Sequence, residues 1–471
     1  MDALAERPPR PSIEVLEALW RDAGLPPDAL SDAVLPADAA VLPSSFDVTT
    51  AVQASLGAAA LAAVQIGRAR GGPAQHVRVE AEHAVLDSLA WFTVDGQAPN
   101  LWDPLSGLYR VADGWVRVHA NFAHHRDGVL GLLGLPAGPQ TPRSAVEAGL
   151  AGWHAQAFED AAAAAGLVVA AARSFAAWDA HPQAAALRAE PLVAIERIGD
   201  APPRPWTPWP SRREGGRPLD GLRVLELTRI LAGPVAGRTL AAYGADVLLI
   251  NAPRLPNIEA IADTSRGKCS AHIDLDTPGG PATMAALVRD AHVFLQGYRP
   301  GALAARGFAP HDLAALSPGI VAVSLSAYGA EGPWAGRRGF DSLVQTATGF
   351  NVAEAQAYGV DTPKALPLQI LDYAAGYLLA FGTQAALLRQ AQEGGSWHVQ
   401  VSLAGVGHWL RGLGRVDALQ AQRPPIEPYI ETVDSGFGRL QVVRHAAHFS
   451  ATPVRWRRPA MPPGSHPPRW P

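Results

Sequence analysis

The stretch Pro-Leu-Asp-Gly-Leu-Arg-Val-Leu-Glu-Leu-Thr-Arg-Ile-Leu-Ala-Gly-Pro, residues 218–234, predicts a strand over 222–227 and a tight turn into a helix. A second strand, Val247-Leu248-Leu249-Ile250, is continuously apolar, which indicates burial on both faces, as in a parallel sheet. The pattern continues, with strands expected at 246–250, 292–296, 320–325 and 397–401 and helices near 235–243, 279–290, 310–316, 341–350, 372–392 and 403–412. This alternation predicts an α/β fold built on a Rossmann-like parallel sheet.

The residues in front of this block have a different pattern. Gly-Trp-Val-Arg-Val-His (114–119) alternates with period two, as in a hairpin, and helices are expected at 126–134, 143–165 and 174–188. Residues 96–200 therefore predict a smaller α+β domain. Prolines exclude both ladder and helix from 201–217, which we interpret as a linker. A large domain over 218–415 is then followed by a tail, 416–471, expected to pack back on it.

Residues 1–95 predict an N-terminal extension that contains a degenerate copy of a later unit. Gly71-Gly72 with His76-Val77-Arg78-Val79 echoes Gly394-Gly395 with His398-Val399-Gln400-Val401. Each copy is flanked by helix-like segments on both sides. The position equivalent to Asp372 falls near Thr49 in the first copy, with Asp47 close by. A partial duplication is the interpretation.

The bulk composition excludes several classes of protein. The 471 residues are 48% apolar and 17% charged, which is typical of a globular protein, and a net charge of −4 leaves no basic footprint for nucleic acid. A single cysteine, Cys269, favours a reducing cytoplasm. The N-terminus has no apolar core of the signal-peptide kind. Residues 51–67 are short for a bilayer and polar in places, so a buried helix is expected rather than a membrane segment.

Further motifs lie within the large domain. They are Arg266-Gly267-Lys268-Cys269-Ser270, Tyr298-Arg299-Pro300-Gly301, Gly339-Phe340-Asp341 and Leu371-Asp372-Tyr373-Ala374-Ala375-Gly376. With residues 218–234 they resemble the family III CoA-transferases, which include formyl-CoA and carnitine CoA-transferases and the related α-methylacyl-CoA racemase. The resemblance implies that family's fold, coenzyme A carried as a substrate thioester, a carboxylic acid acceptor and a homodimer. The smaller domain usually follows the aspartate helix in that family, so its pieces stand here in an altered order.

Asp372 is the predicted nucleophile of this resemblance. It begins a predicted helix, whose free amides and dipole favour an ionised carboxylate. A carboxylate can attack a thioester carbonyl to form a mixed anhydride, which divides a difficult transfer into easier steps. An aspartate at this place in an arbitrary helix would be a capping residue, and the two roles are compatible.

The resemblance also implies which residues hold CoA. The turn Arg229, Ile230, Leu231 and Ala232 resembles the family's CoA-contacting turn, where a following helix N-terminus favours anions. Lys268, Tyr298 and Arg299 lie in motifs that face the nucleotide, because cations suit phosphates and an aromatic ring suits adenine. The nucleotide end departs from the family pattern: Leu249-Ile250-Asn251 replaces a Lys-x-Glu pair, and Ala305 takes the place of an arginine.

Two alternatives stay open beside CoA transfer. A racemase needs a proton-transfer group on each face of the reacting carbon, and the histidine of that branch is replaced by Phe340, which counts against it. Asp341, next in the chain, is interpreted as an N-cap for its own helix. The altered order also fits a non-catalytic family member that acts as a binding or structural partner.

No metal site is expected from the sequence. His124 and His125 are adjacent, and adjacent histidines rarely chelate one tetrahedral ion, so a surface loop or a helix start is the preferred interpretation. The proposed chemistry needs no metal.

Overall fold

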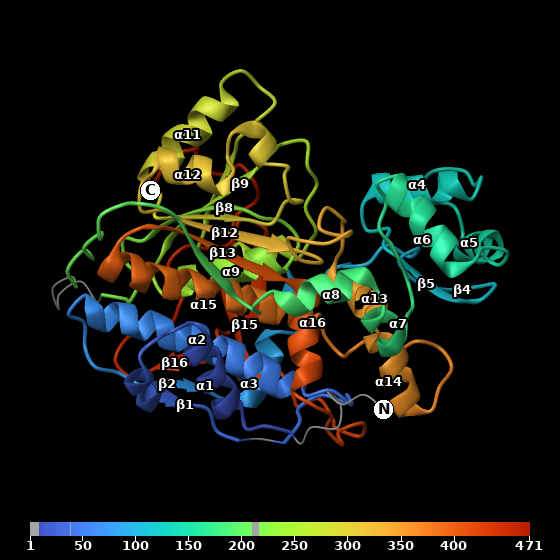
Figure 1. Ribbon diagram of the computed structural model, residues 1–471, viewed down its shortest axis with the longest axis horizontal. Coiled ribbons are helices and arrows are strands. Elements are labelled where there is room, and N and C mark those ends of the chain that lie inside the picture. Colours follow the sequence, from blue (N-terminus) through green and yellow to red (C-terminus); the bar gives the residue numbers. More distant parts are fainter. Residues whose placement is uncertain (1–8, 38, 210–215) are drawn as a thin grey trace.

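A seven-stranded sheet is the frame of the molecule (Figure 1). In a computed structural model, which describes residues 9–37, 39–209 and 216–471, its strands run in the order β10-β9-β8-β11-β12-β13-β7. These strands are β7 (Ala194–Gly199), β8 (Arg223–Leu227), β9 (Asp246–Asn251), β10 (Cys269–His272), β11 (Val293–Gln296), β12 (Val321–Ser326) and β13 (Ser396–Ser402). All neighbours pair in parallel except β7, which is antiparallel to β13. The predicted α/β fold is confirmed; strands β7 and β10 were missed by the prediction.

Helices cover both faces of this sheet, as Figure 1 shows. The covering helices are α9 (Ala232–Ala242) and α15 (Ile370–Glu393) on one face and α11 (Gly280–Asp290) and α12 (Pro310–Leu316) on the other. Successive strand residues enter opposite cores: Val224 packs with α9 and α15, whereas Leu225 packs with α11 and α12. Burial on both faces explains why these strands are continuously apolar in sequence.

The chain reverses its direction of strand addition between β8 and β11. From β8 the chain adds β9 and β10 on one side, then crosses to place β11 on the other side. A crevice forms at such a point, outside the carboxyl ends of the two strands, and α/β proteins bind ligands there.

The smaller α+β unit has its own core. Strands β4 (Gly107–Val111), β5 (Gly114–Val118) and β6 (Val169–Ala171) pair antiparallel and pack against α4 (Ala123–Leu132), α5 (Arg143–Leu150) and α6 (Ala155–Ala164). The single helix predicted over 143–165 is two helices, and 174–188 likewise divides into α7 (Phe175–Asp179) and α8 (Pro182–Ala189). Residues 194–199, which the prediction assigned to the smaller domain without a strand, form β7 and belong to the large sheet because they pair with β13.

The N-terminal residues are integrated into the large core rather than appended to it. Helix α2 (Val48–Ala69) packs along α15, and helix α1 (Ser12–Asp22) packs on α2. Helix α2 is long and apolar enough to cross a membrane, but 94% of its most apolar window is buried inside the protein. The predicted buried helix is confirmed. The two glycine-pair units also have matching elements, since β2 (Val77–Val79) and α3 (Ala81–Asp87) follow α2 as β13 and α16 (Leu403–Gly412) follow α15.

Two small sheets join the ends of the described chain. Strand β16 (Ala447–Phe449) pairs with β2, which also pairs with β1 (Ala33–Val34), and β3 (Phe92–Val94) pairs with β15 (Gly438–Val443) beside β14 (Ile430–Ser435). The remaining elements are η1 (Pro27–Asp32), α10 (Ile261–Thr264), η2 (Ala304–Arg306), α13 (Asp341–Ala347), α14 (Phe350–Tyr358) and η3 (Glu427–Tyr429). Of the predicted linker, 201–209 and 216–217 contain no helix or strand, and 210–215 lie outside the described residues.

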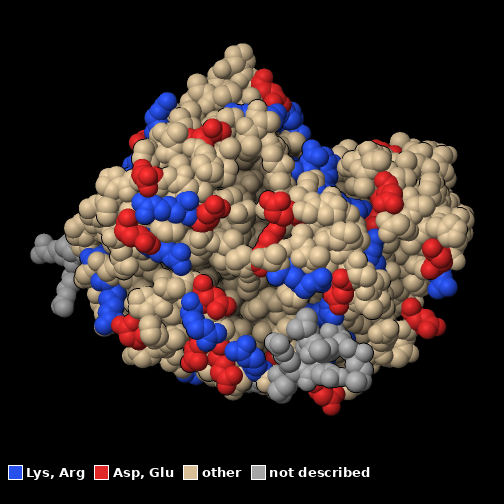
Figure 2. Space-filling view, viewed as in Figure 1, with Lys and Arg blue, Asp and Glu red and all other residues tan. Residues whose placement is uncertain are grey.

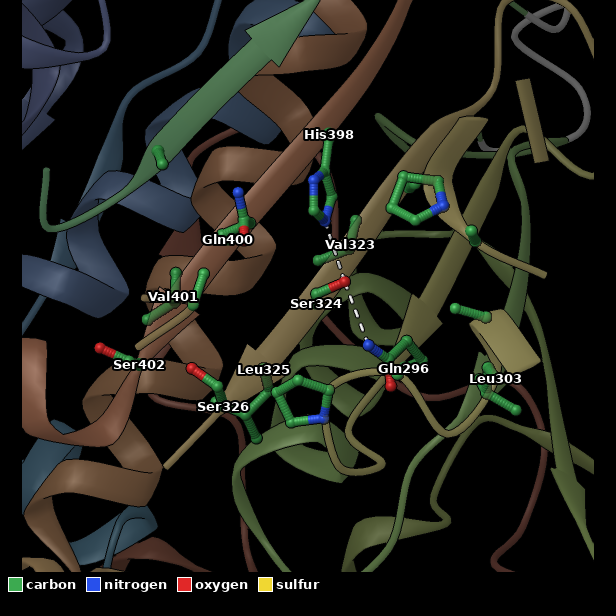
Figure 3. A pocket seen from close by; sticks show the side chains of 18 of the residues that line it. Gln296, Leu303, Val323, Ser324, Leu325, Ser326, His398, Gln400, Val401 and Ser402 are labelled. Carbon is green, nitrogen blue, oxygen red and sulfur yellow. Dashed lines mark hydrogen bonds between the residues drawn. The ribbon is translucent and has the colours of Figure 1, made fainter. Parts of the chain in front are cut away.

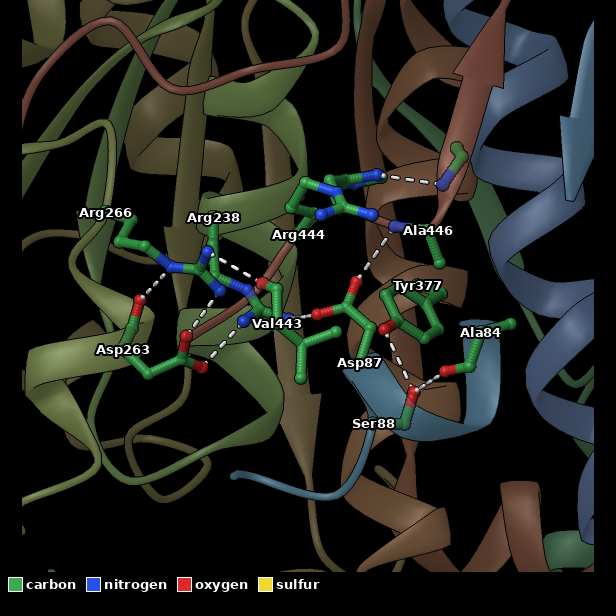
Figure 4. A network of polar contacts seen from close by, with 12 residues as sticks. Ala84, Asp87, Ser88, Arg238, Asp263, Arg266, Tyr377, Val443, Arg444 and Ala446 are labelled. Atoms are coloured by element: carbon green, nitrogen blue, oxygen red, sulfur yellow. Dashed lines mark hydrogen bonds and ion pairs between the residues drawn. The ribbon is translucent and has the colours of Figure 1, made fainter. Parts of the chain in front are cut away.

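A buried charge cluster ties these segments to the large domain (Figure 4). Arg238 on α9 lies 3.1 Å from Asp87 of α3 and 2.6 Å from Asp263 of α10. Asp263 also pairs with Arg266, whose guanidinium donates to the carbonyl of Val443 at 3.0 Å. The side chains of Arg238, Asp87 and Asp263 are at most 5% exposed, so each charge depends on the others for compensation.

The surface in Figure 2 is hollowed between the upper lobe, which carries α11 and α12, and the small unit at the right. Acidic and basic side chains are interspersed over this face instead of gathering into a basic patch. Such a mixed face has no footprint for a nucleic-acid backbone.

Candidate active site

A cavity of about 350 Å³ lies at the carboxyl ends of β8 and β11, at the switch point. Seven of its lining residues are ones that the sequence predicts for the site: Arg229, Ile230, Leu231, Ala232, Tyr298, Arg299 and Asp372. They come from the turn after β8, the turn after β11 and the first turn of α15. The sheet topology brings these three segments together, although 143 positions of sequence separate the first from the last.

The turn after β8 is conformationally strained. Ile230 has a φ of +75°, in the left-handed region that a β-branched side chain rarely adopts. Helix α9 begins two residues later, at Ala232. Strain of this kind persists only where the surrounding structure imposes it, and it is concentrated at functional sites. The turn therefore directs its backbone and the start of α9 toward the cavity.

Lys268 does not line the cavity, and the expectation that it faces the nucleotide needs correction. Its ammonium is fully buried beneath α9, 2.8 Å from the carboxylate of Glu226 on β8 and 2.9 Å from the carbonyl of Pro234. Glu226 also accepts a hydrogen bond from Thr228 at 2.6 Å. Burial lowers the pKa of Lys268, and the charge of Glu226 opposes that shift. The buried Lys268–Glu226 pair thus holds both ends of the strained turn, through Thr228 on one side and Pro234 of α9 on the other.

Gly237 of α9 leaves the room that this buried pair needs. A Cβ at this position would lie 1.8 Å from the Glu226 carboxylate and 2.9 Å from the Lys268 ammonium. We expect Gly237→Ala to lower the free energy of unfolding by about 3 kcal/mol, the upper part of the range for overpacking. Chemical denaturation measures this. Gly412→Ala, whose Cβ would meet nothing within 4 Å near the end of α16, is the control and is expected to be neutral or slightly stabilising. Equal effects of the two changes would contradict the steric argument.

Asp372 is the third residue of α15 and is 8% exposed, with the cavity as its outlet. The N-cap position is held by Gln369, so the capping role considered for Asp372 is wrong. The expectation of an easily ionised carboxylate is also wrong. Burial first, and the neighbouring charge of Asp341 second, raise the pKa of Asp372 well above its ordinary range. Among the described residues no hydrogen bond reaches its carboxylate oxygens, which stay available for chemistry.

The side chain of Asp341 caps the start of α15. One of its carboxylate oxygens accepts from the backbone amides of Leu371 and Asp372, at 2.7 and 3.0 Å, and the other accepts from Gln345 at 2.5 Å. The prediction that Asp341 caps its own helix is therefore wrong, because the carboxylate reaches across to α15. Burial raises the pKa of Asp341 to about 7, although these hydrogen bonds favour its ionised form. Two buried carboxyl groups thus share the start of α15.

The small unit supplies an aromatic wall that sequence reasoning missed. Phe122, His124 and His125 line the cavity, with His125 only 4% exposed in the first turn of α4. The expected helix start is confirmed for His124 and His125, but His125 is buried instead of lying on the surface. Phe340 stacks on His119 with ring centroids 4.0 Å apart, which joins this wall to the loop in front of α13. Burial is the main cause that lowers the pKa of His125 to about 4, so its ring is neutral at pH 7.

Four arginines give the cavity a positive lining. Arg229, Arg299, Arg337 and Arg338 all contribute to it. Arg338 is held by the carbonyl of Gly166 at 2.7 Å, and Arg229 lies over the ring of Phe122 at 5.3 Å. Fixed guanidinium groups recognise phosphates and carboxylates and can stabilise an oxyanion as it develops. The cavity therefore combines one unpaired carboxyl group with cations suited to an anionic substrate. The described residues contain no cluster of three metal-ligating side chains.

Comparisons with known proteins point to one family. Residues 219–428 match the model of the CoA-transferase family III. The chain is 32% identical over 229 residues to the Mycobacterium tuberculosis protein named "Probable fatty acyl-CoA transferase Rv3272", which covers 45% of this chain and 58% of that protein. It is also 32% identical over 240 residues to a succinate–glutarate CoA-transferase of Agrobacterium fabrum, covering 47% and 58%. A crystal structure of Rv3272 has a TM-score of 0.38 at 34% identity, covering 41% of this chain and 58% of that one. The chain thus spans less than two thirds of the length of these relatives.

Proposed function

Because residues 219–428 match the model of the CoA-transferase family III, we propose that this protein moves CoA from an acyl-CoA thioester to a carboxylic acid through Asp372. The observation that carries the proposal is the location of the Asp372 carboxyl group in a cavity lined by four arginines. A nucleophile and cations for anionic substrates are thereby held in one place. The names of the similar proteins support CoA transfer as the reaction class.

The reaction starts when the Asp372 carboxylate attacks the thioester carbonyl. The carbon–sulfur bond breaks, CoA thiolate leaves, and a mixed anhydride joins Asp372 to the acyl group. The thiolate then attacks the Asp372 carbonyl carbon of the anhydride, which forms an aspartyl-CoA thioester and releases the donor carboxylate. An acceptor carboxylate repeats these two steps in reverse order and regenerates Asp372. The cavity arginines would stabilise the negative oxygen that develops in each addition.

Trapping the intermediate tests this mechanism directly. Hydroxylamine cleaves an aspartyl thioester or anhydride and leaves a hydroxamate on the side chain, which mass spectrometry locates on the peptide. We expect the label on Asp372 when the protein is incubated with a CoA ester that it turns over. Turnover with an unlabelled Asp372 peptide would rule out the covalent route.

The paired carboxyl groups predict a particular pH dependence. The nucleophile is the ionised form of Asp372, and burial with a charged neighbour raises its pKa, so kcat/KM is expected to fall as pH is lowered from 8 to 6. The apparent pKa belongs to the pair. Asp341→Asn removes the neighbouring charge and keeps an amide oxygen as acceptor for α15. We expect this variant to lose kcat/KM only at a lower pH than the unaltered protein.

Asp47→Asn is the control for that profile. Asp47 is also a buried aspartate at a helix start, where it accepts from the Thr50 amide at 2.9 Å, but it lies outside the cavity lining. Its profile is expected to match that of the unaltered protein. If the fall of kcat/KM occurred at the same pH in Asp341→Asn as in the unaltered protein, the coupling of the two carboxyl groups would be contradicted.

Exchange of the proton next to the thioester is a second candidate, favoured by one observation. His124 and His125 line the same cavity as Asp372, and a neutral imidazole can accept a proton. Phe340 cannot supply the proton-transfer group of the racemase branch, but these histidines come from another element. Deuterium uptake at the α-carbon in D₂O, without exchange of CoA between acids, would identify this reaction.

The family resemblance also supports a homodimer, and the buried thiol of Cys269 supports a reducing compartment such as the cytoplasm. Light scattering of the purified protein tests the first of these proposals, and fractionation of the source cells tests the second.

A further inference from the structure

A second cavity, of about 330 Å³, adjoins the active-site cavity (Figure 3). Arg299, Pro300, Leu325 and Ser326 line both cavities. The second cavity opens over β11, β12 and β13 on the face of the sheet that α11 and α12 cover elsewhere. Its floor is polar where this face of a doubly wound sheet is normally apolar. The floor side chains are those of Gln296, Ser324, His398 and Gln400.

A hydrogen-bonded chain orders this floor. The backbone amide of Tyr298 donates to the Gln296 oxygen at 2.9 Å, which leaves the Gln296 nitrogen to donate to the Ser324 hydroxyl at 3.1 Å. Nε2 of His398 lies 3.0 Å from the Ser324 hydroxyl, and the tautomer of the ring decides which of the two groups donates. A neutral imidazole carries one N–H donor and one ring nitrogen that accepts. Burial lowers the pKa of His398 to about 4, in agreement with a neutral ring. The floor thus presents ordered, neutral polar groups to the cavity.

Other polar groups of this cavity serve the fold. The Ser326 hydroxyl accepts from the Gly329 amide, and the Ser402 hydroxyl accepts from the Gly405 amide at the start of α16. Glu190 accepts from the amides of Ala330 and Glu331. Gln400 differs, since no hydrogen bond holds its amide among the described residues, and its side chain is drawn at the cavity in Figure 3. The Gln400 amide is therefore free to bind a molecule in the cavity.

The charges of the two cavities differ. Glu190 and Glu331 line the second cavity, and Arg299 is its one cation among the described lining residues. The first cavity carries four arginines. The carboxylates of Glu190 and Glu331 repel a ligand that carries a phosphate or a carboxylate into the second cavity. The neutral floor suits the hydroxyl and carbonyl oxygens of an uncharged ligand.

We propose that the second cavity holds the part of the acyl group that lies beyond the thioester, and that this part is uncharged and carries a hydroxyl or carbonyl oxygen. This inference rests on the proposed CoA transfer. The shared wall lets an acyl group that is attached at Asp372 extend over the end of β12. Donor and acceptor acids occupy the same place in turn, so the floor selects both acids. The His398 ring and the Gln400 amide form hydrogen bonds with the acyl oxygen.

Binding to a variant that cannot turn over tests the proposal. In an Asp372→Asn background, calorimetry would compare CoA, butyryl-CoA, 3-hydroxybutyryl-CoA, 4-hydroxybutyryl-CoA and succinyl-CoA. We expect one hydroxylated ester to bind at least about tenfold more tightly than butyryl-CoA, since a floor built for hydrogen bonds loses them with the plain chain. Gln400→Leu and His398→Phe should reduce that preference to about twofold or less and leave the Kd of CoA unchanged. Gln441→Leu makes the same change on β15, outside both cavities, and should keep the preference.

Each outcome decides a different question. Equal binding of the plain and hydroxylated esters, or a preference that survives both floor substitutions, would overturn the assignment while CoA binding left the transfer reaction standing. Tightest binding of succinyl-CoA would overturn it in favour of a charged acyl group. If neither CoA nor any ester bound, the proposed function would fail and this inference with it.

Discussion

Asp372→Asn is expected to reduce kcat for CoA exchange by at least about 10⁴-fold and to leave the affinity for CoA nearly unchanged. Losses of this size follow the removal of a covalent nucleophile, because no other group continues the same route. Asparagine has nearly the same shape as aspartate and keeps the cavity open. Removal of the Asp372 carboxyl group, which is buried and has a raised pKa, should not destabilise the fold. Isotope exchange between an acyl-CoA and its free acid measures the rate, and calorimetry measures CoA binding.

Asp47→Asn is the matched control for this loss. Asp47 is the N-cap of α2, the helix that corresponds to α15 in the first copy of the repeated unit, and it is 6% exposed against 8% for Asp372. Asparagine also caps helices well, so activity within about twofold of the unaltered protein is expected. Comparable losses in both variants would mean that the effect comes from the fold, and exchange that survives Asp372→Asn would refute a covalent aspartyl intermediate.

Arg238→Met is expected to give the largest loss of stability, about 3–5 kcal/mol in the free energy of unfolding. The substitution removes the cation shared by Asp87 and Asp263, and a buried charge without its partner costs about this much. Asp263 retains Arg266, so Asp87 bears most of the penalty. Because Asp87 belongs to α3 and Asp263 to α10, the cluster helps to attach the N-terminal segment to the large domain. Denaturant unfolding measures the loss.

Arg458→Met is the control for the charge cluster. Arg458 pairs with Asp246 at 3.0 Å, but both side chains are 32% exposed, and solvent screens such pairs. A loss of no more than about 1 kcal/mol is expected. If Arg238→Met were as mild as this control, the buried cluster would not hold the segments together.

The strands of the large sheet could be predicted because burial on both faces leaves a continuous apolar signature in the sequence. Strand β10 lacks that signature, since Cys269–His272 is short and mixes polar with apolar residues. Lys268 shows the limit of motif reasoning. A lysine in a motif that resembles a nucleotide contact can equally be the buried partner of Glu226, and only the position of α9 above it distinguishes the two cases.

The capping of α15 by Asp341 shows a second limit. The two aspartates are 31 positions apart and lie in different helices, so the sequence contains no local sign that they meet. Their contact also reverses the electrostatic expectation for Asp372. The start of a helix favours the ionised form of a carboxyl group, but burial and the charge of Asp341 raise the pKa of Asp372 all the same.

By itself, the sequence determined the α/β class and the buried character of residues 51–67, because hydrophobic periodicity is a local property. The segments that supply Arg229, Tyr298 and Asp372 were identified from motifs that resemble those of the family III CoA-transferases. Only the tertiary structure decided that His125 enters the cavity, that Asp341 reaches α15 and that β13 offers a polar face to the adjoining second cavity. Burial, pKa and cavity shape depend on groups brought together from distant parts of the chain, and these contacts exist only after the sheet and its flanking units have packed.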